Sequence, residues 1–389
     1  MLHSLLPRMF HVKHPDASPG RTSTVFHVKH RRRLLAGALL SVALFGTACA
    51  NIQRPEGWAA PADVDGDVLV QTSTGQVSLV DPASGSIAWS FPNEDKRDHA
   101  FYATPIVDGD AAYLADYAGR IARVSVTDAS EAWAVDLGAH VVATPILDGD
   151  TLYVATADGR IVLIDAATGT VGETLRTSDR RIWGSPAFQG GTLYIGDLDN
   201  GTTVAIDATS GDVVWEQEIS GPSAADLLLD GDLLIVGAFD QHLHALEVAN
   251  GGQERWAFPG DGWFLARPLV SDGIVYAATM NGVVYAIDRA TGAEVWSFVA
   301  GEDAEFRAAP VIAAGHLIAI ARDGRVFALD LQTGDVAWQQ DATLEGNVNA
   351  NPTVVDSDIY LVTSRHELVR VDASSNGAFQ TVPLAAAGQ

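Results

Sequence analysis

The stretch Asp288-Arg-Ala-Thr-Gly-Ala-Glu-Val-Trp296 decides the fold, because variants of it recur along the chain. An Asp ends an apolar run, a Thr-Gly turn follows, and a Trp lies eight residues after the Asp. Asp207 to Trp215 and Asp330 to Trp338 repeat the motif with the same offset, and Asp81 to Trp89 keeps the Asp, Gly and Trp. Looser copies run from Ser125 to Trp133, Asp165 to Glu173, Glu247 to Trp256 and Asp372 to Phe379. A unit that recurs about every 42 residues indicates a propeller or a solenoid.

Each unit also carries the pattern of four short antiparallel strands. It begins near a small-x-Pro step such as Ala143-Thr-Pro145, and two apolar runs joined by a tight Gly turn follow. A third run, of the kind Val283-Val-Tyr-Ala-Ile-Asp288, is apolar on both faces, as expected for a sheet packed between two neighbours. The fourth strand carries the Trp. The sequence therefore predicts an all-β fold, an eight-bladed β-propeller of four-stranded antiparallel blades over residues 59–384.

The repeated Asp and Trp residues are expected to be structural, with each indole buried on the outer strand of its blade. These residues are Asp81, Trp89, Trp133, Asp165, Asp207, Trp215, Trp256, Asp288, Trp296, Asp330, Trp338 and Asp372. The third unit has Glu173 in place of the Trp, so we expect its outer strand to be the most weakly held. Each unit is complete in itself, so closing the ring does not require a strand swapped in from the N-terminus.

The charge of the chain limits its partners. The 389 residues carry a formal net charge of −25, and residues 1–49 hold seven of the basic side chains but one acidic residue. The remainder is therefore strongly acidic, which excludes nucleic acid and anionic membrane surfaces as partners of the folded part. Solubility alone could explain this acidity, and a basic partner is the alternative.

The N-terminal region has the pattern of an export signal. Arg31-Arg-Arg33 precedes an apolar run over residues 34–45, and small residues then lead to Cys49, the single cysteine. Residues 31–49 resemble a bacterial lipoprotein signal in which Cys49 would become the lipidated first residue; plain cleavage and an uncleaved anchor are the alternatives. Residues 50–58 are expected to form a short linker, and residues 385–389 a tail. We thus expect an exported protein, anchored by lipid on the extracytoplasmic face.

Residues 1–30 are interpreted as an extension that lies outside the native protein. Phe10-His-Val-Lys-His14 recurs as Phe26-His-Val-Lys-His30. Two His-x-x-His pairs are compatible with a metal site. We favour another hypothesis, in which both copies are translated from a DNA palindrome that resembles the bacterial chromosome-partition site. The codons of the gene test this hypothesis directly.

The Asp-x-x-Thr-Gly-x-x-x-Trp units resemble the repeats of pyrroloquinoline-quinone enzymes and those of the outer-membrane assembly lipoprotein family BamB. The quinone dehydrogenases of this class are longer, and many pair adjacent cysteines beside the cofactor. The body of this chain contains no cysteine. The resemblance to the short members implies a non-catalytic monomer that needs no cofactor and binds other proteins. The alternatives are a quinone-dependent dehydrogenase and a propeller that binds a small ligand.

Two sequence patterns resemble metal-binding sites but have simpler explanations. Asp-Gly-Asp runs, such as Asp148-Gly-Asp150, lack the later ligands of a calcium loop and are typical of hairpin turns. His242 and His244 share one strand face, where other units carry core side chains, so we expect packed or hydrogen-bonded histidines. We therefore predict no metal site.

The binding surface is expected just before each small-x-Pro step, in the segments that join one blade to the next. Aromatic residues and Arg, the types enriched at binding hot spots, gather in these segments. Sealing of contacts between blades is the alternative role for the aromatic residues. The candidate residues are Phe101, Tyr102, Arg180, Arg181, Trp183, Trp263, Phe264, Arg267, Phe306 and Arg307.

Overall fold

The computed structural model describes residues 58–72, 75–92, 100–176, 180–341, 344, 346–374 and 376–382. All of them belong to one compact unit that spans residues 56–389. The signal at residues 31–49 with Cys49, the extension 1–30, the linker 50–57 and the tail 385–389 lie outside the described residues. Among the described residues, no helix is long and apolar enough to cross a membrane.

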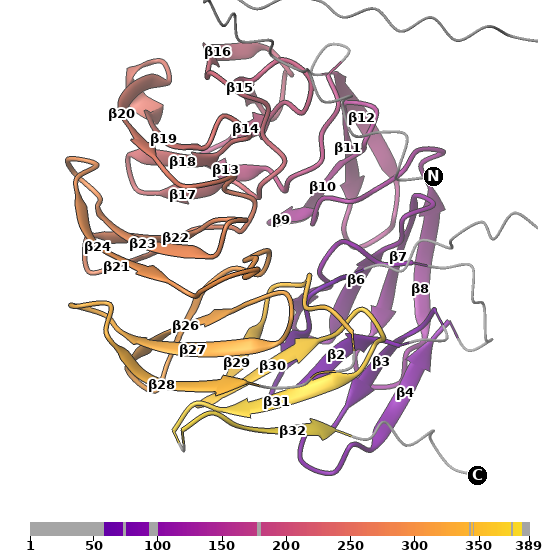
Figure 1. Ribbon diagram of the computed structural model, residues 1–389. Coiled ribbons are helices and arrows are strands. Elements are labelled where there is room, and N and C mark those ends of the chain that lie inside the picture. Colours follow the sequence, from indigo (N-terminus) through magenta and orange to yellow (C-terminus); the bar gives the residue numbers. More distant parts are fainter. Residues whose placement is uncertain are drawn as a thin grey trace, which may run out of the picture. The chain divides into compact units, whose positions relative to one another are not determined.

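Eight four-stranded antiparallel sheets form a ring, which confirms the predicted eight-bladed propeller (Figure 1). The first strands of the blades are β1 (Ala62–Val64), β5 (Ile106–Asp108), β9 (Ile146–Asp148), β13 (Ala187–Gln189), β17 (Leu228–Asp230), β21 (Leu269–Ser271), β25 (Val311–Ala313) and β29 (Thr353–Val355). The second strands are β2 (Asp67–Gln71), β6 (Ala111–Ala115), β10 (Thr151–Ala155), β14 (Thr192–Gly196), β18 (Leu233–Gly237), β22 (Ile274–Ala278), β26 (His316–Ile320) and β30 (Asp358–Val362).

The outer half of each blade completes the sheet. The third strands are β3 (Val77–Val80), β7 (Arg120–Ser125), β11 (Arg160–Asp165), β15 (Thr202–Asp207), β19 (His242–Glu247), β23 (Val283–Asp288), β27 (Arg325–Asp330) and β31 (Leu368–Asp372). The fourth strands are β4 (Ile87–Phe91), β8 (Glu131–Asp136), β12 (Val171–Arg176), β16 (Val213–Glu218), β20 (Gln253–Pro259), β24 (Glu294–Val299), β28 (Val336–Asp341) and β32 (Ala378–Val382). A single turn of 3-10 helix, η2 (Val248–Asn250), joins β19 to β20.

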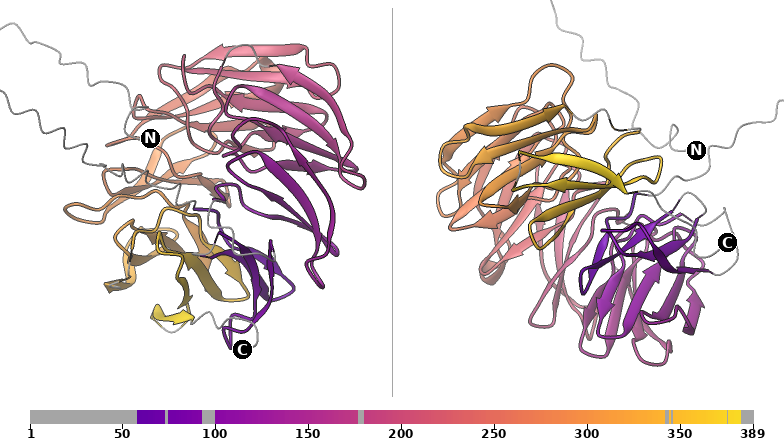
Figure 2. Two further views of the ribbon diagram at one scale, coloured as in Figure 1. Left: turned by 90° about the vertical axis from the view of Figure 1, so that its right-hand side faces the viewer. Right: turned by 90° about the horizontal axis from the view of Figure 1, so that it is seen from below.

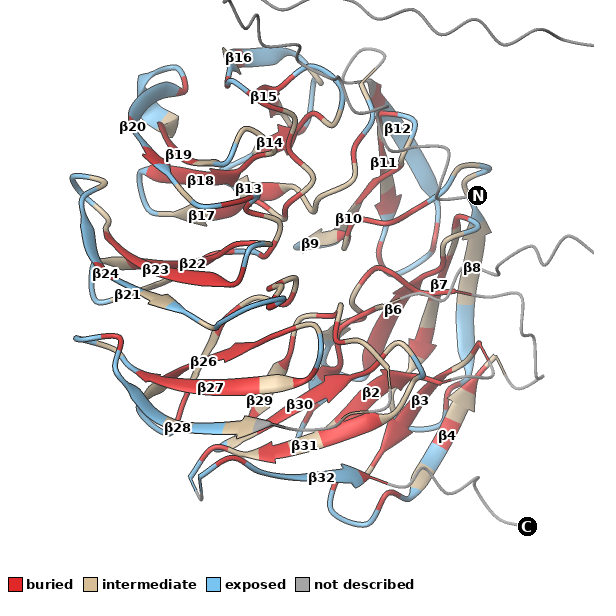
Figure 3. Cartoon of the chain, in the orientation of Figure 1, coloured by how far each residue is buried: buried red, intermediate tan, exposed pale blue. Residues whose placement is uncertain are grey.

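The core lies between the blades. The second and third strands are buried on both faces, whereas the fourth strands are mostly exposed (Figure 3). In β23, for example, Val283 to Ile287 are all buried. This burial confirms the interpretation of the apolar third runs as strands between two neighbouring sheets.

The Asp-x-x-Thr-Gly sequence forms the turn between the third and fourth strands. The carboxylate of Asp288 accepts hydrogen bonds from the Thr291 amide at 2.8 Å and the Thr291 hydroxyl at 2.6 Å, and these bonds lower the pKa of Asp288. Gly292 follows with φ of +73°, a conformation that glycine adopts without steric cost. The Asp and the Gly therefore both suit this turn, which the second blade forms with Ser125 and with Ala129 at φ of +57° instead.

Where it occurs, the repeated Trp joins its blade to the next one. The Trp256 indole donates from Nε1 to the carbonyl of Arg289 at 2.9 Å, and its ring covers Gly292, where a Cβ would lie 2.6 Å from it. The Trp296 indole bonds Leu331 in the same way at 3.1 Å. Trp89, Trp215, Trp256 and Trp296 are buried, and Trp133 and Trp338 are half-buried. In the third blade, Glu173 is exposed and Leu175 packs beside Gly211 of the next blade instead.

The ring closes between β29–β32 and β1–β4, which lie side by side in both views of Figure 2. Each of these sheets is built from its own end of the chain, so no strand of the described residues is exchanged across the closure. Val70 and Val80 of the first blade pack with Tyr360 and Val362 of the eighth. The structure thus confirms that a swapped N-terminal strand is not needed.

Candidate functional site: the central channel and its rim

Two parts of the propeller gather side chains suited to a partner: the mouth of the central channel and the loops around it. The segments that enter the first strands line the mouth, and all eight blades contribute. The lining residues are Trp58, Ala60, Tyr102, Thr104, Val142, Thr144, Trp183, Ser185, Ala224, Asp226, Leu265, Arg267, Arg307, Asn349 and Asn351. They enclose a cavity of about 110 Å³.

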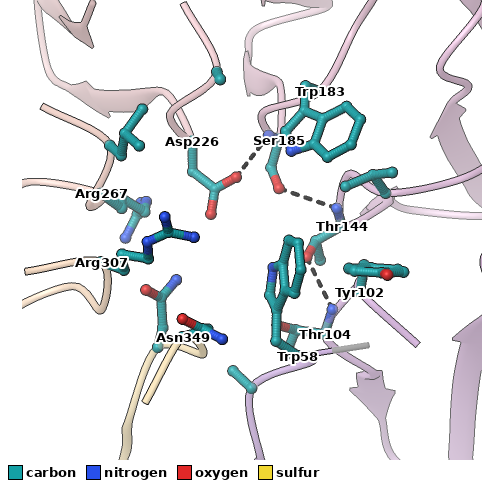
Figure 4. Close-up of a pocket in the computed structure, with 15 residues that line it drawn as sticks. Trp58, Tyr102, Thr104, Thr144, Trp183, Ser185, Asp226, Arg267, Arg307 and Asn349 are labelled. Atoms are coloured by element: carbon teal, nitrogen blue, oxygen red, sulfur yellow. Dashed lines mark hydrogen bonds between the residues drawn. The ribbon is translucent and has the colours of Figure 1, made fainter. Parts of the chain in front are cut away.

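A belt of hydrogen bonds links neighbouring blades in this lining. The Thr104 amide donates to the Thr144 hydroxyl at 3.0 Å, and the Thr144 amide donates to the Ser185 hydroxyl at 3.0 Å. The Ser185 amide donates to the carboxylate of Asp226 at 2.7 Å (Figure 4). Each accepting side chain lies just before the first strand of its blade. It is a short side chain, and it accepts from a backbone amide of the preceding blade. The belt therefore fixes these side chains around the mouth.

The mouth has two chemically different sides, as Figure 4 shows. Trp58, Tyr102 and Trp183 lie on one side, where the rings of Trp58 and Tyr102 meet edge to face with centroids 4.3 Å apart. Arg267 and Arg307 lie across from them. Burial and the nearby Arg322 lower the pKa of Arg307, although Glu305 acts in the opposite direction. An aromatic wall thus faces a cationic one.

Two aromatic side chains in contact lie outside the channel lining, and we call Phe239 and Trp263 the rim patch. Trp263 is 43% exposed, and its ring meets Phe239 edge to face with centroids 5.1 Å apart. The Met280 amide donates to the Trp263 carbonyl at 3.0 Å, which holds the β22–β23 turn against the β20–β21 loop. The patch is therefore presented by loops on a rigid base.

The structure divides the ten candidate binding residues into separate groups. Tyr102, Trp183, Arg267 and Arg307 come together at the channel mouth, and Trp263 lies on the rim. Arg180 pairs with Glu216, and Arg181 pairs with Asp199. Neither of these two arginines lines the cavity.

Four aromatic candidates are buried, which corrects that part of the sequence interpretation; one of them, Tyr102, is 7% exposed but still lines the channel mouth. Phe101 is 4% exposed, and Phe264 and Phe306 are 0% exposed. Phe264 packs near Tyr285, and Phe306 packs near Phe327, so both fill the spaces between blades. Phe101, Phe264 and Phe306 therefore seal contacts between blades, which is the alternative role expected for the aromatic residues.

Sequence reasoning did not select the polar lining of the mouth. Thr104, Thr144, Ser185 and Asp226 are small polar residues and carry no motif, although each occupies the same place before its first strand. An alignment of the eight repeats at the start of the first strand would have found these residues. They then share one position of the repeat, which corresponds to one depth in the channel.

The two patterns that invited a metal are structural. Gly109, Gly149 and Gly231, the central residues of three Asp-Gly-Asp runs, have φ near +55° in turns between first and second strands. His244 is 2% exposed and hydrogen-bonds Glu254 at 2.7 Å and Asp240 at 3.2 Å. Among the residues that the structure describes, no group of three or more His, Cys, Asp or Glu side chains could hold a metal ion.

Comparison with known proteins decides the family. The family model described as "Outer membrane protein assembly factor BamB" matches residues 170–262 and 248–386, together more than half of the chain. The chain belongs to the BamB family. A BamB of Burkholderia pseudomallei is 32% identical over 114 residues, which cover 29% of each protein. That of Salmonella typhimurium is 23% identical over 252 residues, which cover 61% of this chain and 53% of the relative. The chain thus matches less than a third of the first relative's own length.

Solved structures of the same fold extend beyond the BamB family. The crystal structure of BamB from Moraxella catarrhalis superposes with a TM-score of 0.68 at 19% identity, over 80% of this chain and 95% of that one. The computationally designed protein Ika8 gives 0.70 at 16% identity over the same shares. A europium-containing methanol dehydrogenase gives 0.62 at 14% identity, over 80% of this chain and 81% of that one. At these identities the three structures share the fold with this chain.

Proposed function

We propose that this chain is a non-catalytic scaffold that binds protein partners during the assembly of outer membrane proteins. Membership of the BamB family supports this role, because the relatives are named as assembly factors. The sequence alternative of a quinone-dependent dehydrogenase has less support, since the dehydrogenase is similar in fold alone. A titration with quinone and calcium, followed by dye reduction, tests that alternative.

The rim patch is the observation that carries the proposal, since it offers a partner an exposed indole on a fixed frame. Trp263 is the one tryptophan among the described residues whose side chain is largely exposed. Indoles and aromatic rings are the anchors that contribute most to protein interfaces. Phe239 supports the indole from the side, so little conformational entropy is lost on binding.

Two arginines of the β12–β13 loop, in a separate part of the ring, would add electrostatic selectivity. Arg181 and Asp199 form an ion pair at the rim, and the Arg181 guanidinium lowers the pKa of Asp199. A partner with its own charged groups can exchange with such an exposed pair at little cost. Arg180 is held by Glu216 and would orient the same loop.

The protein is further proposed to be exported and anchored by lipid through Cys49 on the extracytoplasmic face, and to act there as a monomer. The pattern of residues 31–49 supports export. Metabolic labelling with a radioactive fatty acid tests the anchor. The native chain should incorporate the label, and the Cys49→Ala variant should not. Label in the variant would refute lipidation at this residue.

The assembly role is tested by deleting the gene in the cell of origin and measuring the level of outer membrane proteins. We expect the level to fall, and plasmid-borne native protein to restore it. The double variant Phe239→Ala, Trp263→Ala should fail to restore it while accumulating normally. Val299→Ala, at a 66% exposed position of β24, is the matched control and should restore it. A double variant that complements fully would refute the rim as the binding surface.

A further inference from the structure

The mouth of the channel contains two arginines that form no ion pair within the described part of the chain. Ion pairs hold most other arginines of the described body, among them Arg120, Arg160, Arg180, Arg181, Arg255, Arg289, Arg322, Arg325 and Arg370. Arg267 and Arg307 form no hydrogen bond or ion pair with any residue that the structure describes. In a chain of net charge −25, two arginines at one mouth that pair with no described residue indicate a site that attracts an anion.

An enclosed donor points in the same direction. The Nε atom of Arg307 is shielded from solvent and has no hydrogen-bond partner among the described residues. Arg307 lines the cavity. An enclosed charged donor without an acceptor costs free energy that a ligand oxygen would recover. A carboxylate suits a guanidinium because its two oxygens match the planar fork of donors.

The opposite wall selects the body of the ligand. Trp58, Tyr102 and Trp183 lie across the cavity from the arginines (Figure 4). Asp226 stands between the two walls, and the Ser185 amide already occupies one of its oxygens. Aromatic walls favour a flat apolar group by stacking or edge contacts. The cavity of about 110 Å³ is smaller than the usual site of a drug-sized ligand, so the ligand is small.

We infer that the channel mouth is a binding site for a small aromatic carboxylate, with its carboxylate on Arg307 and Arg267 and its ring against Trp58 and Trp183. The site is separate from the rim patch, and its occupation does not depend on a protein partner. The carboxylate can belong to a free aromatic acid or to the C-terminal aromatic residue of a peptide, which presents the same chemistry.

Benzoate and its neutral isostere benzamide test the inference on the purified propeller. Binding is followed by the change in tryptophan fluorescence and, independently, by the rise in melting temperature that a ligand of the native state produces. We expect saturable binding of benzoate and at least about tenfold weaker binding of benzamide, since the amide lacks the charge. N-acetyl-phenylalanine and its amide form the second arm. Tighter binding of N-acetyl-phenylalanine than of benzoate would identify a peptide terminus as the source.

Variants assign the binding to the site. Arg307→Gln should weaken benzoate binding about tenfold or more, because it removes the charged fork. Arg267 is exposed, so Arg267→Gln should fold normally and still weaken binding, which keeps the test decisive if Arg307→Gln does not fold. Arg120→Gln, in an exposed ion pair outside this cavity, is the matched control. Trp263→Ala should also leave benzoate binding unchanged, which separates this test from that of the rim.

Three outcomes would overturn the inference. The first is an absence of saturable benzoate binding up to about 10 mM, a concentration at which even a millimolar site is filled. The second is equal affinity for benzoate and benzamide. The third is an affinity for benzoate that neither Arg307→Gln nor Arg267→Gln changes.

Discussion

Replacement of Gly334 by Ala should destabilise the propeller far more than the same replacement at Gly315. Both glycines have positive φ, +73° and +79°, so Ala carries a similar backbone cost at each, about 1–2 kcal/mol. They differ in their surroundings. A Cβ on Gly334 would lie 2.6 Å from the Trp296 ring, whereas a Cβ on Gly315 would meet no atom within 4 Å. The indole cannot retreat freely, since it is 7% exposed and bonded to the Leu331 carbonyl.

The extra cost at Gly334 is that of overpacking, about 1–3 kcal/mol. We therefore expect a loss of about 2–5 kcal/mol in the free energy of unfolding for Gly334→Ala, against about 1–2 kcal/mol for Gly315→Ala. Urea titration followed by far-ultraviolet circular dichroism measures both, with the slopes compared to check that the transitions stay cooperative.

A double-mutant cycle shows whether the indole is responsible. In a Trp296→Ala background, Gly334→Ala should cost no more than Gly315→Ala, because the clashing ring is gone. The coupling between positions 296 and 334 should reach about 1–3 kcal/mol. Equal losses for Gly334→Ala and Gly315→Ala in the native background, or no coupling in the cycle, would refute the role assigned to the repeated Trp and Gly.

Three further perturbations test other parts of the fold. Hydrogen bonds from Arg289 and Arg255 lower the pKa of Asp232 from 3.8 to about 2, so its contribution to stability should be complete above about pH 4 and lost as the pH falls toward 2. Urea midpoints of Asp232→Asn should therefore match the native protein more closely at pH 2 than at pH 6; an equal gap at both would contradict this. Thr144→Val leaves the Thr104 amide without its acceptor and should cost about 1–3 kcal/mol in urea titration, whereas Thr144→Ser should cost much less. Leu175→Ala should cost about 2–5 kcal/mol by the same assay, and a loss below 1 kcal/mol would show that Leu175 does not replace the missing Trp.

The fold could be predicted from the sequence because its determinants are local. The Asp288 turn, the apolar third run and the Trp296 position lie within a single repeat, and the number of repeats gives the number of blades. The backbone carbonyl that each indole contacts lies one repeat further along the chain. The contact between blades therefore recurs with the same spacing as the repeat.

The site could be predicted only in part because it arises from closure of the ring. Trp263 and Phe264 are neighbours in sequence and of similar type, yet one is 43% exposed and the other 0%. Adjacent residues in a loop point in different directions, and composition does not say which one faces the core. The belt that joins Thr144 to Ser185 was missed for a related reason, since its members meet only when two blades are placed side by side.

The seam between the last and first blades differs from the others in a way that predicts where the molecule opens. No peptide linkage crosses this seam within the described residues, and the position of the indole is taken by Phe379, which is 38% exposed. The seam depends instead on apolar packing around Val70 and Tyr360 and on a hydrogen bond from Thr353 to the Pro61 carbonyl. Breathing of the ring should therefore start there, and amide protons of β2 and β30 should exchange with deuterium sooner than those of β22 and β26.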